Sequence, residues 1–191
     1  MKTASKRFWL RQVTAAAAIA TLGPLALAQE APKSVRIGWA IAKTGHNAGG
    51  TAATVMPNYQ LWVKEINAAG GIMLKAYGKR VPIEVVEYDD RSSTEEAVRA
   101  TERLMTQDKV DFVLPPWSTG SNLAVGPTYE KHKYPLLAAT AVTDKAPELA
   151  KRWKHAFFFL GTGAGYAESL VSYLESAKKE GKIGNKIAMI N

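Results

Sequence analysis

Six short apolar runs, separated by segments with helical spacing, constrain the fold of this chain more than any other feature. We predict strands at 35–41, 81–88, 110–114, 134–140, 156–161 and 186–191. Apolar residues at helical spacing predict helices near 55–66, 93–104, 121–131 and 166–179. Several runs are apolar throughout, which is typical of strands buried on both faces of a parallel sheet. The pattern therefore predicts an α/β fold with a doubly wound, Rossmann-like parallel sheet.

Composition limits the classes of function. The chain has 191 residues, 47% of them hydrophobic and 22% charged, which is enough for one ordinary globular core. Its formal charge is +8, but four of the 25 bases lie in the first 28 residues, which contain no acid. The remaining 21 bases against 17 acids form no basic stripe, so we expect no nucleic-acid binding. The absence of cysteine excludes disulfides, cysteine-ligated zinc and thiol nucleophiles.

Residues 1–28 have the pattern of a cleaved export signal. A basic start is followed by an apolar stretch over 13–27 and by a small-x-small motif that ends at Ala28. The stretch is shorter than the roughly 20 apolar residues of a membrane-spanning helix. The start also resembles a twin-arginine signal with Lys6 in place of the first arginine, so the export route stays open. We expect cleavage after Ala28 and a mature protein outside the cytoplasm.

The stretch "VDFVLPPWSTGSN", residues 110–122, carries hydroxyl groups directly after a buried strand. In doubly wound sheets, ligands bind beyond the carboxyl ends of the strands, where helix N-termini present free N–H groups. With the helix expected to begin near Ser121, Ser118 and Thr119 lie too early to cap it and are predicted to contact an anionic ligand. Ser121 and Asn122 are either helix caps or ligand contacts.

Four stretches together resemble a known family. They are "IGWAIAKTGHNAGG", "EINAAGGI", the long segment from "YGKRVPIEVVEYDDRSSTEE" to "VDFVLPPWSTGSNLAVGPTYEK", and "YPLLAATAVTDKAPEL". In this order and spacing they are similar to the solute-binding proteins of branched-chain amino acid ABC transporters, the type I periplasmic binding proteins that include the leucine/isoleucine/valine-binding proteins. The likeness covers nearly all of 35–191.

The resemblance implies a two-lobed receptor that closes around an amino acid, or a related amide or acid, and delivers it to a membrane permease. It implies no chemistry on the ligand, no cofactor and no metal. The family holds the ligand carboxylate with a serine hydroxyl after the third strand and with groups after the fourth. Carried over, the ligand-binding residues are Trp117, Ser118, Thr119, Ala139, Thr140, Ala141 and Thr143.

Two departures from the family pattern leave the ligand's identity open. Trp117 stands where the family commonly has a small residue, and Gly49-Gly50 lies where an aromatic wall residue is often near. The loop that contains Ala139 to Thr143 is also longer than usual, which leaves the choice among its residues open.

The resemblance also implies a division of the chain. We expect a signal peptide at 1–28, an N-terminal ligand-binding lobe at 29–160, and a crossover with the start of a second lobe at 161–191. On this interpretation the chain is an N-terminal fragment with a truncated second lobe, and it is not expected to bind tightly by itself. The glycines of "GTGAG", residues 161–165, would allow a hinge motion between lobes.

The alternative hypothesis is a secreted α/β enzyme that acts on a nucleotide or an acyl substrate. "GTGAG" superficially suggests a dinucleotide-binding loop, but Tyr166 stands where the motif needs glycine or alanine. His46, His132 and His155 lack metal-ligand spacing and are expected near the surface.

Three local patterns complete the expectations. Asp89-Asp90 is expected to form a turn, because neighbouring acids on a strand point apart. The spacing Ser93-Thr94-Glu95-Glu96 predicts a capping box at a helix start. The run Phe157-Phe158-Phe159 is expected in the core.

Overall fold

The computed structural model describes residues 30–186 and residue 188. The predicted export signal falls outside these residues. Apart from Lys186 and Ala188, so does the predicted strand at 186–191.

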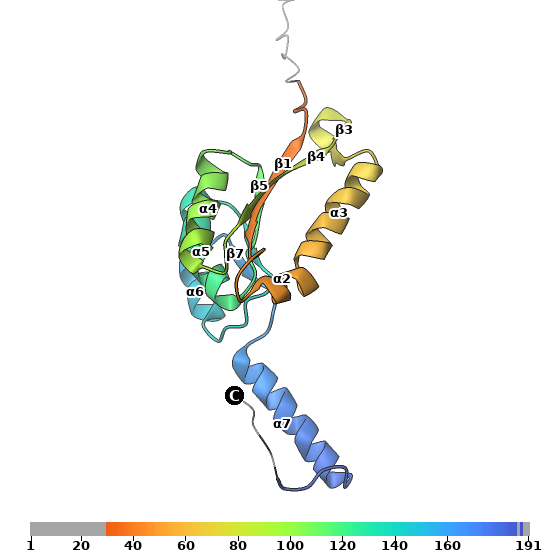
Figure 1. The fold of residues 1–191 in the computed structure, drawn as a ribbon, viewed down its shortest axis with the longest axis vertical. Helices are drawn as coiled ribbons and strands as arrows, with labels where there is room; N and C mark the ends of the chain where they lie inside the picture. Colours follow the sequence, from red (N-terminus) through yellow and green to blue (C-terminus); the bar gives the residue numbers. More distant parts are fainter. Residues whose placement is uncertain (1–29, 187, 189–191) are drawn as a thin grey trace, which may run out of the picture. The chain divides into compact units, whose positions relative to one another are not determined.

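A parallel sheet of three strands, in the order β4-β1-β5, forms the centre of the fold (Figure 1). Strand β1 spans Val35–Ile41, β4 spans Ile83–Asp89 and β5 spans Phe112–Leu114. All but one residue of β1 are buried, because this strand has a neighbour on each side and helices over both faces. The expected parallel α/β sheet is confirmed.

Helices cover both faces of this sheet (Figure 1). Helix α2 (Ala48–Thr54) and helix α3 (Met56–Ala68) lie on one side, and helix α4 (Thr94–Thr106) and helix α5 (Thr119–His132) lie on the other. Each side has its own hydrophobic cluster, one with Trp39 at its centre and one with Leu104. A doubly wound sheet has helices on both faces, so the expected doubly wound fold is also confirmed.

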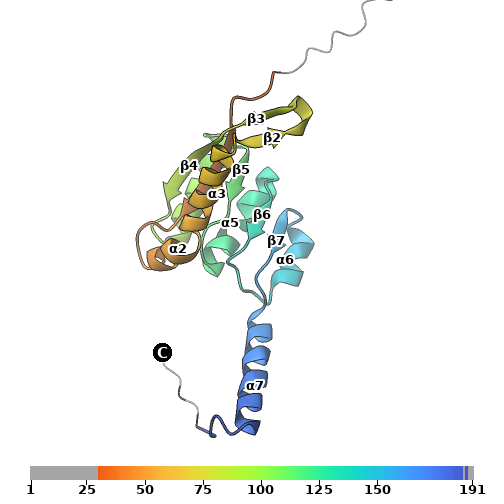
Figure 2. The same cartoon turned by 90° about the vertical axis from the view of Figure 1, so that its right-hand side faces the viewer.

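Beyond the central sheet, a second parallel pair joins β6 (Leu136–Ala138) to β7 (Ala156–Phe158) (Figure 2). Helix α6 (Ala146–Arg152) connects them, and Trp153 at its end packs directly on Gly126 of α5. A β-carbon on Gly126 would lie 2.5 Å from the Trp153 ring. This close contact fixes α6 against α5.

An antiparallel hairpin precedes the second strand of the sheet (Figure 2). Its strands are β2 (Ile72–Leu74) and β3 (Lys79–Val81), joined by the short helix η1 (Lys75–Tyr77). The single strand predicted at 81–88 is therefore wrong in detail, since Pro82 has no N–H and separates β3 from β4. The hairpin, α2 and α6 were not predicted from the sequence.

Helix α7 spans Gly163–Lys179, close to the predicted 166–179. Its first turn is capped twice, because Thr162 Oγ1 accepts from the Gly165 amide at 3.0 Å and Asp144 Oδ1 accepts from the Ala164 amide at 3.2 Å. Two glycines of "GTGAG" thus lie inside a helix. Over the residues that the structure describes, no helix combines the length and apolar character needed to cross a membrane.

The aromatic run before α7 is not a core segment. Only Phe158 packs against the hydrophobic cluster, whereas Phe157 and Phe159 are 50% and 66% exposed. The prediction of a buried run was wrong because successive side chains on a strand point to opposite faces, and only one face of β7 meets the core.

Candidate functional site

The candidate site lies where the segments after β5 and β6 meet. Strand β5 ends at Leu114 and β6 ends at Ala138, and polar side chains connect the residues that follow. Thr140 Oγ1 donates to the Pro116 carbonyl at 3.3 Å. The amide of Val142 donates to Thr119 Oγ1 at 3.0 Å. The structure thus brings together the two segments in which the sequence predicted ligand-binding residues.

Ser118 caps helix α5, contrary to the expectation that it lies too early to do so. It is the N-cap residue, and its Oγ accepts from the Ser121 amide at 3.1 Å. The helix begins at Thr119, two residues before the predicted start, because this hydroxyl satisfies one of the four free amides of the first turn. Ser121 is not the cap but a buried residue of that turn.

The backbone of Ser118 has a conformation that is almost restricted to glycine. Its φ is 86° and its ψ is 150°. A residue with a side chain is strained here by about 1–3 kcal/mol, and such strain is concentrated at functional sites. The amides of Thr119 and Gly120 belong to the first turn of α5, at a helix end that carries a partial positive charge. The arrangement can bind an anionic group.

Thr119 and Thr140 have structural hydrogen bonds as well. Thr119 Oγ1 accepts from Val142 and thereby ties the start of α5 to the segment after β6. Thr140 Oγ1 donates to Pro116 and accepts from Asn122 Nδ2 at 3.1 Å, which uses its proton and one of its two lone pairs. The remaining lone pair of Thr140 can accept from a cationic donor.

The other candidates of the second segment differ in exposure. Ala139 is exposed, whereas Ala141 is fully buried within the hydrophobic cluster, so only its backbone can reach a ligand. Thr143 Oγ1 accepts from the Lys145 amide at 3.2 Å, in the turn that precedes α6. Thr143 therefore shapes the approach to that helix.

Trp117 lies across helix α2. Its Nε1 donates to Thr54 Oγ1 at 2.9 Å, and its ring covers Gly50, where an added β-carbon would lie 2.3 Å from Cζ2. The two departures noted in the sequence are thus one feature. The Trp117 ring fits here only because Gly50 has no side chain. Trp117 on Gly50 stands in place of the aromatic wall expected from the first segment.

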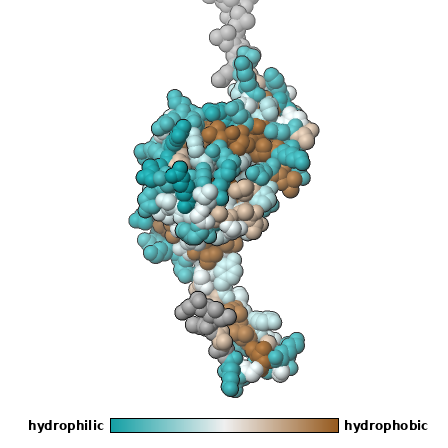
Figure 3. All heavy atoms as spheres, in the orientation of Figure 1, coloured by the Kyte–Doolittle hydropathy of each residue, from teal (hydrophilic) through white to brown (hydrophobic). Residues whose placement is uncertain are grey.

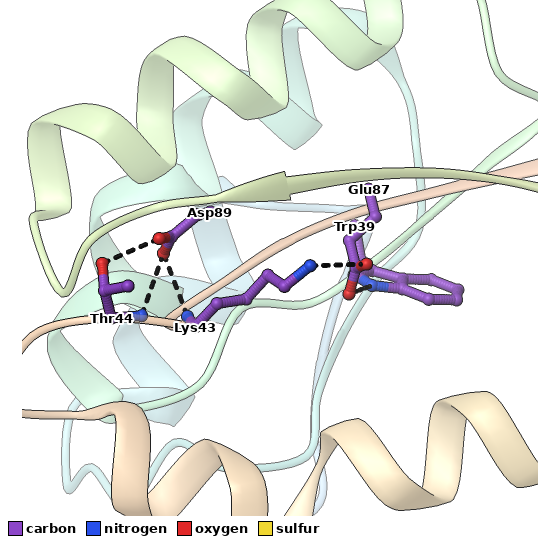
Figure 4. Close-up of polar contacts among 5 residues, drawn as sticks. All are labelled: Trp39, Lys43, Thr44, Glu87 and Asp89. Carbon is purple, nitrogen blue, oxygen red and sulfur yellow. Dashed lines mark hydrogen bonds and ion pairs between the residues drawn. The ribbon is translucent and has the colours of Figure 1, made fainter.

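Asp89, the last residue of β4, holds the loop between β1 and α2 (Figure 4). Its Oδ1 accepts from the amides of Lys43 at 3.0 Å and Thr44 at 3.3 Å, and its Oδ2 accepts from the Thr44 hydroxyl at 2.7 Å. Partial burial acts to raise the pKa of Asp89, but the Thr44 hydroxyl and the amides of Arg91, Lys43 and Thr44 outweigh it and lower the pKa below its ordinary value.

Next to this clamp, Glu87 contacts Lys43 of the same loop and Trp39 of β1 (Figure 4). It accepts from Trp39 Nε1 at 2.9 Å and pairs with Lys43 Nζ at 3.0 Å. Trp39 is almost fully buried, so the carboxylate satisfies the one polar atom of its ring. The loop after β1 is therefore held firmly against the end of β4.

The predicted turn at Asp89-Asp90 is confirmed. Asp90 Oδ1 accepts from the Ser92 amide at 2.8 Å, and burial raises the pKa of Asp90.

Only half of the predicted capping box forms. Ser93 Oγ accepts from the Glu96 amide at 3.2 Å, but the Glu96 carboxylate pairs with Arg99 instead of returning to Ser93.

The histidines have structural partners. His132 Nε2 lies 2.9 Å from Glu102, and His155 Nδ1 lies 3.1 Å from Glu130, while His46 is exposed. Hydrogen bonds from Lys131 and His132 lower the pKa of Glu102. Within residues 30–186 and 188, no three acidic or histidine side chains are grouped closely enough to hold a metal ion.

The fold agrees with a comparison to known families. The profile of the periplasmic binding protein family matches residues 34–191. The chain belongs to this family. Members of the periplasmic binding protein family are solute-binding receptors rather than enzymes.

Three solved structures illustrate the likeness. The substrate-binding protein LivJ of the branched-chain amino acid transporter from Streptococcus pneumoniae, solved with isoleucine, is 35% identical with a TM-score of 0.58 over 68% of this chain and 34% of its own. A putative branched-chain amino acid ABC transporter protein from Silicibacter pomeroyi is 19% identical, with a TM-score of 0.63 over 81% of this chain and 38% of its own. A solute-binding protein from Rhodopseudomonas palustris, solved with 3,4-dihydroxybenzoic acid, is 23% identical, with a TM-score of 0.55 over 69% of this chain and 33% of its own.

These periplasmic binding proteins are much longer than the matched part. The chain spans 33% to 38% of their lengths.

Asn122 is the residue of the site whose role the sequence did not reveal. It neither caps α5 nor lies open to a ligand, since it is fully buried between the two segments. A buried asparagine and a capping asparagine can have the same local sequence, so only the three-dimensional structure distinguishes the two roles.

Proposed function

We propose that this chain provides the N-terminal lobe of an extracytoplasmic receptor that binds an amino acid or a related solute and delivers it to an ABC transporter permease. Membership of the periplasmic binding protein family supports the receptor role. The isoleucine in the 35% identical Streptococcus pneumoniae protein supports the class of solute.

The strained N-cap at Ser118 is the observation that carries the proposal. Ser118 Oγ accepts from the Ser121 amide, so the cap does not use its proton. In the structure that proton is donated to Ser121 Oγ at 3.1 Å, a neutral acceptor. A ligand carboxylate would be a stronger acceptor, since hydrogen bonds to an ionised group are roughly twice as strong as neutral ones. The amides of Thr119 and Gly120 would add two further donors.

The other candidates take complementary roles. Thr140, with a free lone pair, and the exposed Ala139 would accept from the ammonium group of the solute, through a hydroxyl and a backbone oxygen respectively. Ala141 would contribute only backbone, and Thr143 would hold the turn behind it. Trp117, fixed on α2, would form the wall for the side chain of the solute and would restrict its size.

The processing of the chain follows from the same proposal. Residues 1–28 would act as a signal peptide cleaved after Ala28, residues 29–160 would form the ligand-binding lobe, and 161–191 would form the crossover and the start of a second lobe. The receptor would then act in the periplasm. N-terminal sequencing of the exported protein should find Gln29 first, and an intact Met1 would contradict this.

Removing the Ser118 hydroxyl tests the site. In the full-length protein, as its gene encodes it, Ser118→Ala should weaken solute binding by about 10- to 150-fold, since a hydrogen bond to a charged group is worth roughly 1.5–3 kcal/mol. It should also lower the free energy of unfolding by about 1 kcal/mol, because the cap is lost. Mass spectrometry of the copurified solute identifies the ligand, and calorimetric titration with a thermal melt measures both effects.

Ser93→Ala is the matched control. Ser93 caps α4 through the same kind of bond, 3.2 Å from its Oγ to the Glu96 amide. Its loss should cost a similar stability and leave affinity unchanged. Equal behaviour of the two variants would mean that Ser118 is only a cap and that the site lies elsewhere. Turnover of a nucleotide or an acyl substrate would overturn the receptor function itself.

A further inference from the structure

Asn122 connects three groups that belong to the two segments of the site. Its Nδ2 lies 2.9 Å from the Pro116 carbonyl oxygen, 2.8 Å from the Ser118 carbonyl oxygen and 3.1 Å from Thr140 Oγ1, so its two N–H groups are shared among three acceptors. The side chain is fully buried. One amide nitrogen thus lies at the junction of the segment after β5, the start of α5 and the segment after β6.

The opposite atom of the same amide has no such partners. Asn122 Oδ1 is buried and accepts no hydrogen bond from any residue that the structure describes. A buried acceptor left in this state is destabilising. The Oδ1 atom of Asn122 therefore costs stability. We attribute the presence of asparagine here to the geometry that its Nδ2 imposes on the two segments.

Both carbonyl acceptors of Asn122 also have a second donor. The Ser118 carbonyl accepts from the backbone amide of Asn122 at 3.1 Å, and the Pro116 carbonyl accepts from Thr140 Oγ1 at 3.3 Å. Loss of the side-chain amide would leave neither carbonyl without a hydrogen bond. What the amide alone supplies is the three-way connection.

We propose that Asn122 is a positioning residue that sets Ser118 and Thr140 at the separation and orientation needed to hold the two ends of one solute molecule. This inference rests on the proposed receptor function. The bond to the Ser118 carbonyl holds the backbone of Ser118 in its strained conformation, and the bond to Thr140 fixes the neighbouring segment relative to it. Asn122 acts through these residues and does not touch the ligand.

Asn122→Leu separates positioning from stability. Leucine has the branched shape of asparagine but a larger volume; it removes the buried Oδ1 and leaves both carbonyls bonded, which offsets the cost of overpacking, so the melting temperature should change by less than about 3 °C. The segments lose their connection, so the affinity of the full-length protein for L-isoleucine should fall at least about fivefold. Titration calorimetry and a thermal melt measure the two quantities.

Asn67→Leu is the matched control. Asn67 is also an asparagine that clamps backbone, since it donates to the Ile83 carbonyl at 3.0 Å and accepts from the Ile83 amide at 2.7 Å. Ile83 begins β4, so this clamp lies at the opposite end of the strand from the site. Asn67→Leu should lower the melting temperature and leave the affinity unchanged, the reverse of the pattern for Asn122→Leu.

Asn122→Asp gives a pH readout that a purely structural role would not produce. An ionised carboxylate has no proton for the three acceptors, whereas a protonated carboxyl group can donate one hydrogen bond. Burial raises the pKa of such a carboxyl group. Relative to the natural protein at the same pH, Asn122→Asp should therefore recover affinity as the pH falls, and Asn122→Leu should not.

Amide hydrogen exchange tests the inference without any ligand. In Asn122→Leu, the amides of 139–143 should exchange at least about tenfold faster than in the natural protein, while those of α4 keep their rates. Failure of the natural protein to bind any amino acid or related amide or acid would refute the receptor function, and the exchange data would still decide the role of Asn122. Unchanged exchange, or unchanged affinity in a receptor that binds L-isoleucine, would overturn the inference.

Discussion

At the scale of single residues, Asp89 shows how one carboxylate can fix a loop. It ends β4 and binds the loop that follows the neighbouring strand β1, because Ile41 and Asp89 are paired in the parallel register. The loop therefore depends on the charge of Asp89. Hydrogen bonds from Lys43 and Thr44 favour the ionised form.

The lowered pKa of Asp89 predicts a dependence of stability on pH. A carboxylate with a lowered folded pKa contributes stability that is fully present above its ordinary value of 3.8 and is lost as the pH falls through the folded pKa. Asp89→Asn should therefore lower the melting temperature at pH 7, and the difference from the natural protein should narrow below pH 3.8. Thermal melts from pH 7 to pH 2 measure this. A difference that stays constant over that range would show that the charge of Asp89 contributes nothing.

The sequence placed the candidate residues in a strand-to-helix turn but did not assign their roles. It predicted a helix start near Ser121, whereas the helix begins at Thr119 with Ser118 as its cap. The sequence could not show that Ser118 caps the helix, because that depends on a φ value that serine rarely adopts. The partnership of Trp117 with Gly50 spans 67 positions of the chain, and only packing reveals it.

At the scale of elements, the contact between α5 and α6 depends on one glycine. Gly126→Ala should destabilise the fold by about 1–3 kcal/mol, although alanine favours a helix, because its methyl group would overlap the Trp153 ring. Gly49→Ala is the control, since a β-carbon there meets no atom within 4 Å and should be neutral or stabilising. Denaturant unfolding measures both. Equal stabilities would mean that Trp153 moves aside without cost.

Long elements were predicted better than short ones. The periodicity of α3 and α4 extends over 13 residues each, so the pattern identified both. The hairpin strands β2 and β3 have three residues each, which is too short for a period to emerge. Their turn depends on Gly78, whose φ is 58°, and the sequence alone does not distinguish this glycine from others.

At the scale of the molecule, exposed apolar side chains are concentrated near the C-terminal end of the described chain. Tyr166, Leu170, Val171 and Tyr173 on α7 are 53% to 69% exposed, and brown spheres follow this helix in Figure 3. Contiguous apolar surface of this kind marks an interface or leads to association.

We therefore expect the 191-residue chain to bind a hydrophobic dye and to associate as its concentration rises. The double variant Phe159→Ser with Tyr173→Ser should reduce both effects. Leu61→Ser with Met73→Ser, on singly exposed residues elsewhere, should not. Dye fluorescence and sedimentation velocity measure the two properties. A monodisperse chain without dye binding would show that this surface is not adhesive.

The fold class was predictable because it depends on a pattern repeated along the whole chain. Each apolar run between helical segments independently favours a parallel sheet, so errors in single strands did not change the result. The edge of the sheet at which the candidate residues lie followed from the same pattern. The contact of Trp117 with Gly50 did not, because no repeated pattern encodes a single contact.

At Ser118, the residue that best suits folding differs from the residue that best suits ligand recognition. Glycine would relieve the strain of a φ of 86° and would cap the helix almost as well as serine. It would also remove the hydroxyl proton, which the cap does not use. Selection for stability alone would therefore drive this position toward glycine, and on the proposed function selection for capture of a carboxylate would oppose it. This one replacement would then abolish solute capture while the protein continued to fold and accumulate.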